Sequence, residues 1–250
     1  MSERIDKILA HEGFGSRKDI KKLLRSAEVL LNGVQIFDPG TQINPDADTI
    51  SIDGEEIDLH QHVYLMMNKP KHTVSSNKDG EHQTVFDLLD DSFHTPYMTD
   101  HLHLIGRLDM DTEGMLIFTT DGELTHRMIS PKSHVNKTYY CELEHPETAE
   151  HQDEITRQFL EGIEVGPEDN EPGFRCEPAQ IKWISENKAE LTIYEGKYHQ
   201  VKRMFVAVQN KITYLKRLSM GKLKLDPTLE TGEYKYLSDE EVDLLSTQDS

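Results

Sequence analysis

Three carboxylates lie close together in a segment that begins and ends with glycine. The segment reads GRLDMDTEG over residues 106–114. Asp109 and Asp111 could bind a divalent metal ion, and a pair of carboxylates could also cleave a glycosidic bond. A third interpretation gives the acids no chemistry and lets them cap a loop between two strands. Spacing alone favours loop capping, because no further cluster of ligand spacing and no aromatic platform for a neutral sugar accompanies these acids.

Two later segments carry side chains that could complete a polar site. One is Lys137-Thr138-Tyr139, and the other reads EGKYHQVKRMF over residues 195–205. In the second segment apolar residues recur with helical spacing, at Val201, Met204, Phe205 and Val208. A helix with this pattern buries that face and leaves Lys202 free for a polar site, although an exposed surface lysine would show the same spacing.

Together these segments resemble the motifs of the bacterial pseudouridine synthases, which convert uridine within RNA to its carbon-linked isomer. The resemblance implies that Asp109 is the essential catalytic residue and that Lys202 pairs with it. It implies that Tyr139 is a catalytic residue that stacks on the uracil and can serve as a base, and that Arg107 fills the stack vacated by the target base. The isomerisation involves no redox change, so neither a cofactor nor a metal is expected.

The resemblance extends from about Tyr64 to Leu237, and the forms YLMMNKP and HQVKRMF are closest to the branch that modifies the small ribosomal subunit. The expected substrate is therefore a specific uridine in 16S rRNA, presented as rRNA or as a small-subunit assembly intermediate. A synthase for large-subunit rRNA and a non-catalytic ribosome-assembly factor are the alternatives. One departure is His72, where the family commonly has glycine. Four further residues are assigned to RNA binding: Lys69, His199, Gln200 and Arg203.

The larger part of the chain must form strands and helices that position these residues. From Tyr64 onward, β-type runs alternate with helical stretches at 124–129 and 199–209. This pattern predicts an α+β fold, with a mixed and mainly antiparallel sheet flanked by helices. Neither GxGxxG nor GxxxxGK[ST] occurs, so no dinucleotide or nucleoside triphosphate site is indicated.

The N-terminal part predicts a helix pair followed by a small β-unit. Ser16 and Asp19 have the spacing of a capping box that opens a helix running to about Ser26. On that helix one face is basic and the opposite face is apolar. The basic residues are Arg17, Lys18, Lys21, Lys22 and Arg25. The pattern SRKDIKKLL, with a later VLLNG, resembles the S-four RNA-binding domain, which implies that the basic face binds structured RNA.

These patterns divide the chain into four regions. We expect an S-four-type RNA-binding domain at 1–58, a linker at 59–63, a catalytic domain at 64–238 and a solvated acidic tail at 239–250. The linker contains His60 and His62, but no carboxylate or cysteine spacing there indicates a metal site.

Net charge by itself points away from nucleic acid. The 250 residues contain 27 Lys and Arg against 46 Asp and Glu, a formal charge of −19. Two basic islands nevertheless stand out, at residues 13–27 and at residues 197–224, where eight basic residues occur without an acid. Two cysteines cannot build a disulfide framework, and no apolar run is long enough to span a membrane. We therefore expect a cytoplasmic monomer that does not bind membranes.

Overall fold

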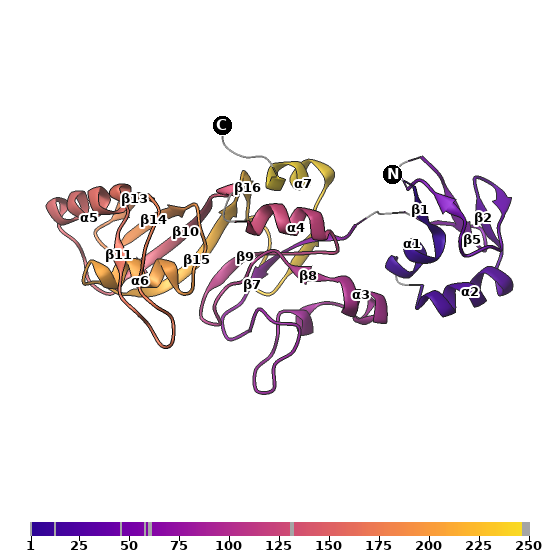
Figure 1. The fold of residues 1–250 in the computed structure, drawn as a ribbon, viewed down its shortest axis with the longest axis horizontal. Helices are drawn as coiled ribbons and strands as arrows, with labels where there is room; N and C mark the ends of the chain where they lie inside the picture. The colour runs from indigo at the N-terminus through magenta and orange to yellow at the C-terminus, as the bar shows by residue number, and fades with distance from the viewer. Residues whose placement is uncertain are drawn as a thin grey trace. The chain divides into compact units, whose positions relative to one another are not determined.

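The computed structural model describes residues 2–12, 14–45, 47–57, 59, 62–130 and 133–246. The chain divides into two compact units (Figure 1). Unit 1 comprises Met1–Tyr64, Leu89–His103 and Phe118–Asp121, and unit 2 comprises Leu65–Leu88, Leu104–Ile117 and Gly122–Ser250. The predicted fold class is confirmed: a small N-terminal α/β module accompanies a mixed, mainly antiparallel sheet with helices.

The N-terminal module follows its sequence signals closely. Helix α2 begins where the capping box predicts, because Ser16 Oγ accepts the Asp19 N–H and Asp19 Oδ2 accepts the Ser16 N–H, at 3.3 and 3.1 Å. The helices and strands are β1 (Glu3–Arg4), α1 (Ile5–His11), α2 (Arg17–Ser26), β2 (Val29–Leu31), β3 (Val34–Gln35), β4 (Gln42–Ile43), β5 (Ile50–Ile52) and β6 (Glu55–Ile57). Four of the strands form a sheet in the order β3-β2-β5-β6, and β1 pairs with β4.

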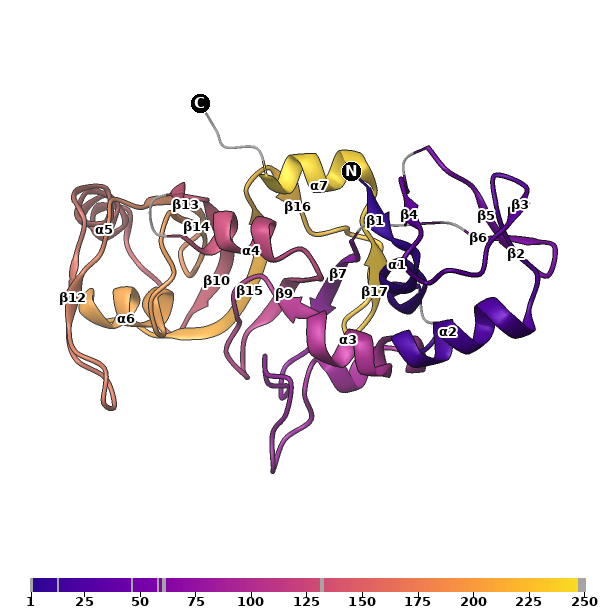
Figure 2. The same ribbon diagram turned by 45° about the vertical axis from the view of Figure 1, so that its right-hand side comes forward.

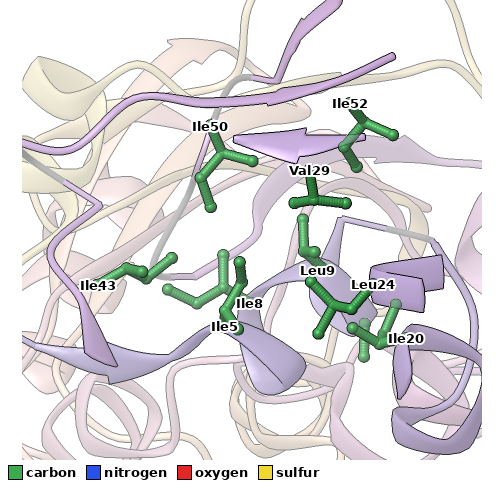
Figure 3. Packing of buried hydrophobic residues seen from close by; sticks show 10 residues of the cluster. Ile5, Ile8, Leu9, Ile20, Leu24, Val29, Ile43, Ile50 and Ile52 are labelled. Carbon is green, nitrogen blue, oxygen red and sulfur yellow. The ribbon is translucent and has the colours of Figure 1, made fainter. Parts of the chain in front are cut away.

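Two Asx-Gly pairs make the tight hairpins of this sheet. Asn32 and Gly33 have φ values of 50° and 79°, and Asp53 and Gly54 have 49° and 87°. Successive positive φ angles suit a two-residue turn whose twist matches that of the strands. The sheet covers the apolar faces of α1 and α2, where Ile5, Leu9, Ile20, Leu24, Val29 and Ile50 are completely buried (Figure 3).

The larger sheet supplies the framework for the candidate site. Its main path runs β13-β14-β10-β15-β9-β7-β17. The pairs β13–β14, β14–β10, β10–β15 and β7–β17 are antiparallel, and β15 and β9 are parallel. The strands are β7 (Tyr64–Lys69), β8 (His103–Leu104), β9 (Glu113–Thr119), β10 (Lys137–Leu143), β13 (Gln180–Ser185), β14 (Lys188–Ile193), β15 (Ile212–Met220), β16 (Leu223–Lys224) and β17 (Tyr234–Tyr236).

Both predicted helices of this part are present, as α4 (Gly122–Ile129) and α6 (Gln200–Ala207). Helix α5 (Ala149–Glu161) was not predicted. It lies in an acid-rich stretch, yet Ile155 and Phe159 are completely buried. The remaining elements are η1 (Phe86–Leu88), η2 (Asp91–His94), α3 (Pro96–His101), β11 (Glu164–Val165), β12 (Phe174–Arg175) and α7 (Asp239–Ser246).

The predicted acidic tail needs a correction at α7. Residues 239–246 are helical, Leu245 is completely buried, and the Leu244 carbonyl accepts the Lys222 N–H at 3.1 Å. Helices α4 and α7 lie side by side in both ribbon views (Figure 2). The buried side chain of Leu245 and the backbone carbonyl of Leu244 thus hold in place a segment whose acids suggested free solvation. Residues 247–250 of the tail, and His60 and Gln61 of the linker, lie outside the described residues.

No helix among the residues that the structure describes combines the length and the apolar character needed to cross a membrane.

Candidate active site

A cavity of about 370 Å³ in unit 2 brings together most of the candidate catalytic residues. It is lined by the loop before β9, by one face of β10 and β15, and by the segment that leads into α6. Among the lining residues are Arg107, Asp109, Tyr139, His199, Gln200 and Lys202. Segments separated by more than 90 positions in the chain therefore meet at one site.

A glycine fixes where the Asp109 loop joins the sheet. Gly114 has a φ of 103° and is the Cα partner of Arg217 in the parallel β9–β15 pair. A Cβ at this position would collide with the backbone carbonyl oxygen of Arg217. Only glycine combines that conformation with so close an approach of two backbones. The strand that follows the loop is therefore held against β15 at a defined register.

Lys69 holds the other side of this loop, and its side chain is buried rather than exposed at a surface where RNA was predicted to bind. Its side chain is completely buried, and Nζ donates to the carbonyl oxygens of Pro70, Asp109 and Thr112 at 2.9, 3.1 and 3.0 Å. Burial lowers the pKa of Lys69 to about 8, although Asp109 and Asp111 partly oppose that effect. All three bonds serve the protein's own backbone, so Lys69 is a structural residue.

His72 adopts a backbone conformation that favours glycine. Its φ is 66°, in the left-handed region, and its N–H donates to the Met110 carbonyl at 2.7 Å. This bond ties the Lys-Pro loop to the Asp109 loop. At a position where the family commonly has glycine, His72 therefore takes a conformation that other residue types rarely adopt.

Lys202 lies between two carboxylates. Its Nζ is 2.8 Å from Asp109 Oδ2 and 2.6 Å from Asp111 Oδ1. Burial opposes the charge on Lys202, but these two hydrogen bonds outweigh it and raise the pKa of the ammonium. Burial tends to raise the pKa of Asp111, but the hydrogen bond and the charge of Lys202, with smaller contributions, together lower it. Asp109 is the more enclosed of the two acids, with 31% of its side chain exposed against 64% for Asp111.

Helix α6 presents Lys202 as its apolar spacing predicts. Val201, Met204 and Phe205 are buried on the opposite face. His199 precedes the helix with a left-handed φ of 47° and stacks on Tyr198 with ring centroids 3.8 Å apart. Its Nε2 lies 3.8 Å from Asp109 Oδ1, and its Nδ1 lies 3.2 Å from Glu168 Oε2. His199 is thus beside the carboxylate pair.

Two predicted RNA contacts are buried in the protein instead. Gln200 is 3% exposed and donates to Glu195 Oε1 at 2.7 Å. Arg203 is 5% exposed, and its Nη2 donates to the carbonyl oxygens of Gly166 and Pro172, both at 2.6 Å. These bonds fasten the loop before β12 and the turn before α6. The basic sequence around them therefore does not form a continuous RNA-facing surface.

Tyr139 and Arg107 occupy different environments at the cavity. Tyr139 is 8% exposed on β10, whereas Arg107 is exposed. No hydrogen bond or ion pair joins the Arg107 guanidinium to any described residue. The flat ring of Tyr139 could stack on a flipped base. The Arg107 guanidinium could occupy the space that this base leaves in the RNA stack.

Sequence reasoning missed three basic residues of the cavity, Lys137, Lys197 and Arg217. Lys137 Nζ donates to the Val135 carbonyl at 2.9 Å, and Arg217 Nε donates to the Met115 carbonyl at 2.8 Å. The strand alternation of the Lys-Thr-Tyr run could have placed Lys137 on the face of Tyr139. Nothing local distinguishes Arg217 from its less buried neighbours Lys216 and Leu218, since its position depends on pairing between distant strands.

The predicted RNA-binding face of α2 is open to solvent. Ile20 and Leu24 are buried, and all five basic residues named for this helix are exposed. Within the described ranges, no group of three or more His, Cys, Asp or Glu side chains could hold a metal ion.

Comparisons with known proteins agree with both parts of this description. The RNA pseudouridylate synthase family model matches residues 63–207, and the S4 domain model matches residues 3–48. The chain is 42% identical to an uncharacterized RNA pseudouridine synthase, YtzG, of Bacillus subtilis, over 97% of this chain and 98% of that protein. It is also 42% identical to ribosomal small subunit pseudouridine synthase A of Vibrio cholerae, over 96% and 97%.

A crystal structure of a pseudouridylate synthase is similar over 97% of this chain and 99% of that one, at 34% identity and a TM-score of 0.65.

Proposed function

Since the chain belongs to the RNA pseudouridylate synthase family, an isomerase family, we propose that it converts a specific uridine of 16S rRNA to pseudouridine. The observation that carries this choice of RNA is the similarity to small-subunit synthases over nearly the whole length. These relatives are 42% identical in Vibrio cholerae and 36% identical in Escherichia coli. The substrate is 16S rRNA or an assembling small subunit, met in the cytoplasm by a monomeric enzyme.

Asp109 is the catalytic residue of this proposal. The reaction breaks the bond between N1 of uracil and C1′ of ribose, turns the base and joins its C5 to the same carbon. A carboxylate serves either by attacking the sugar or base, or by removing a sugar proton. Lys202 Nζ lies 2.8 Å from Asp109 Oδ2 and offsets its negative charge in a partly enclosed site.

Arg107 and Tyr139 provide contacts that offset the free energy needed to flip a stacked base out of the RNA. Flipping a nucleotide costs a few kcal/mol, which protein contacts must offset. The exposed Arg107 is available to fill the vacated stack, and the ring of Tyr139 in the cavity wall is available to pack on the uracil. Stacking of a base on an aromatic ring contributes about 1–3 kcal/mol.

The N-terminal module binds RNA, and we assign that contact to α2. Its five exposed cations lie opposite the buried Ile20 and Leu24. Structured RNA is recognised largely by shape and phosphate position, which a basic helix face can follow. Near the cavity, Arg107 and His199 remain candidate contacts, whereas the side chains of Lys69, Gln200 and Arg203 are buried and hydrogen-bonded within the protein.

Tritium release tests this function directly. RNA labelled at C5 of uridine loses tritium when pseudouridine forms, so the wild-type protein should release it from small-subunit RNA. Asp109→Asn should abolish release and leave RNA binding largely intact, because it removes the charge and keeps the shape. Glu123→Gln, which changes an exposed acid on α4, is the matched control and should be fully active.

Each other outcome separates one part of the proposal from the rest. Release from large-subunit RNA alone would overturn the choice of substrate. Release from neither RNA would favour an assembly factor. Substantial activity of Asp109→Asn would remove Asp109 from the catalytic role.

A further inference from the structure

Two cations flank Tyr139 on the sheet face that forms part of the cavity wall. Arg217 on β15 is the Cα partner of Tyr139 on β10. Lys137 precedes Tyr139 by two residues on the same strand, and all three side chains line the cavity. Directly paired residues, and residues two apart on a strand, project from the same face of a sheet. A base packed on Tyr139 would therefore have a positive charge on either side.

The charge on Arg217 lacks a counter-ion. The side chain is 1% exposed, and its Nε donates to the Met115 carbonyl at 2.8 Å. Its Nη2 is buried with no hydrogen-bond partner, and no carboxylate in the described part of the chain pairs with it. A guanidinium cannot become neutral by losing its proton. A buried unpaired donor is costly and rare, so a ligand that completes it is the expected explanation.

The pKa of Lys137 reflects the same excess of positive charge beside Tyr139. Burial, and next the charge of Arg217, lower the pKa of Lys137 to about 8, and no described carboxylate offsets them. Its Nζ has a neutral carbonyl, that of Val135, as an acceptor at 2.9 Å. Two neighbouring cations without an acid form a site suited to negative charge.

We propose that Arg217, assisted by Lys137, binds the carbonyl edge of the flipped uracil and stabilises the negative charge that the ring carries once it leaves the sugar. This inference rests on the proposed function, because it takes the base on Tyr139 to be the reacting uracil. Arg217 becomes a catalytic residue of the isomerisation, beside Asp109.

The charge arises from the bond that must break. When N1 parts from C1′ the electron pair stays on uracil and spreads onto O2 and O4. Asp109 meanwhile either bonds to the sugar carbon or takes a sugar proton that it later returns. An electron pair of the ring then forms the C5–C1′ bond, C5 loses its proton, and N1 gains one. The base ends neutral, and no oxidant or reductant takes part.

The position of Arg217 favours a base over an RNA phosphate. A phosphodiester is bulky and strongly hydrated, and it would have to reach a side chain that is 1% exposed. A flat uracil can lie against Tyr139 and present its carbonyl oxygens to the neighbouring groups. Preorganised donors at such a position act where charge develops in the transition state.

A comparison of two leaving groups tests the proposal. Single-turnover rates are measured for 16S rRNA transcripts made with uridine or with 5-fluorouridine, by nucleoside analysis after digestion. Because C5 of 5-fluorouridine carries fluorine and has no proton to lose, conversion of that substrate is followed as loss of 5-fluorouridine rather than as formation of pseudouridine. Arg217→Gln should slow conversion of uridine by about 100-fold, the usual cost of losing one such donor. It should slow conversion of 5-fluorouridine much less, because the fluorinated base is the stronger acid and leaves more readily without help. Equal slowing of both substrates would overturn the proposal.

Further variants keep the result interpretable. Arg217→Lys retains the charge and should retain most of the rate. If Arg217→Gln does not fold, as judged by thermal unfolding, Lys137→Met should show the same difference between substrates with a smaller loss. Arg157→Gln, on the exposed side of α5, should change neither rate. RNA affinity measured by filter binding should stay constant across the set, and a loss confined to affinity would contradict a role in catalysis.

The two proposals fail in distinguishable ways. A wild-type protein that converts no uridine in 16S rRNA would refute the proposed function. A wild-type protein that is active, together with Arg217 and Lys137 variants that slow both substrates alike, would refute only this inference.

Discussion

At the scale of single residues, Lys69 shows how a charge can serve the site from inside the protein. It donates to backbone carbonyls of the loop that contains Asp109, and it reaches Asp109 through the main chain only. Lys202 reaches the same residue through its carboxylate. Lys69 thus supports the loop, and Lys202 offsets the negative charge of the Asp109 carboxylate.

Substitution of Lys69 by methionine should destabilise the protein. The change leaves three buried carbonyls without their donor, which costs about 3 kcal/mol. Isomerisation should fall as well, because the Asp109 loop loses its support. Denaturant unfolding at pH 7.5 measures the stability, and Lys182→Met on the exposed side of β13 is the control.

The same variant has an expected pH dependence. The pKa of Lys69 is about 8 in the folded protein, below the ordinary 10.5. The pH-dependent part of its contribution to stability is therefore fully present above pH 10.5 and is lost as pH falls through 8, and it adds to the effect of the hydrogen bonds. The stability advantage of wild type over Lys69→Met should grow between pH 8 and 10.5. A difference that stayed constant over this range would show that Lys69 keeps an ordinary pKa.

At the scale of elements, the contact of β9 with β15 carries the Asp109 loop. Gly114 makes that contact possible, since a Cβ there would collide with the Arg217 carbonyl oxygen. Arg217 is also the proposed catalytic cation, so one register positions both the loop and the cation.

Gly114→Ala should cost about 3 kcal/mol of stability, because it combines overpacking with a side chain at positive φ. It should also remove activity. Gly122→Ala, at the start of α4, is the matched control, because a Cβ there meets no atom within 4 Å. Thermal unfolding of the two variants measures the difference, and equal stability would refute the close packing of β9 on β15.

Helix α2 makes a separate prediction about RNA. Replacement of Lys18, Lys21 and Lys22 by glutamine should reduce the slope of log affinity against log salt by about two, if each lysine neutralises one phosphate. Filter binding to 16S rRNA over a range of salt concentrations gives this slope. Because these residues lie on the exposed face of α2, the unfolding midpoint should not change. An unaltered slope would remove α2 from the RNA contact.

At the scale of the whole molecule, net charge describes the protein poorly. The basic island at 197–224 contains Arg203 and Arg217, which are 5% and 1% exposed. Part of the basic sequence therefore builds the protein's interior. The island at 13–27 behaves differently, since its cations are exposed on α2.

The two cysteines give a check on the packing of the large sheet and its surroundings. Cys141 and Cys176 are free thiols that are 0% and 3% exposed. Burial raises the pKa of both, that of Cys176 to about 11. Neither should react with a thiol reagent at pH 8 in the folded protein, and both should react in denaturant. Rapid reaction of either thiol in the folded protein would contradict this packing.

The sequence by itself determined what depends on neighbours along the chain. The Ser16–Asp19 cap, the two Asx-Gly turns, the strands β7, β9, β10, β14 and β15 of the large sheet and the apolar face of α6 all follow from local spacing. The resemblance of the motif segments to a family also sufficed to identify an RNA pseudouridine synthase. Helices α5 and α7 were not predicted, because the many acids in these segments obscured the spacing of the apolar residues that pack inward.

Only the tertiary structure decided which cations face outward and which are buried. Lys69, Gln200 and Arg203 looked like surface residues, yet each donates hydrogen bonds inside the protein. Arg217 reaches the cavity because β15 pairs with β10 on one side and with β9 on the other. Burial and cross-strand register depend on contacts between distant segments, and local sequence patterns do not specify those contacts.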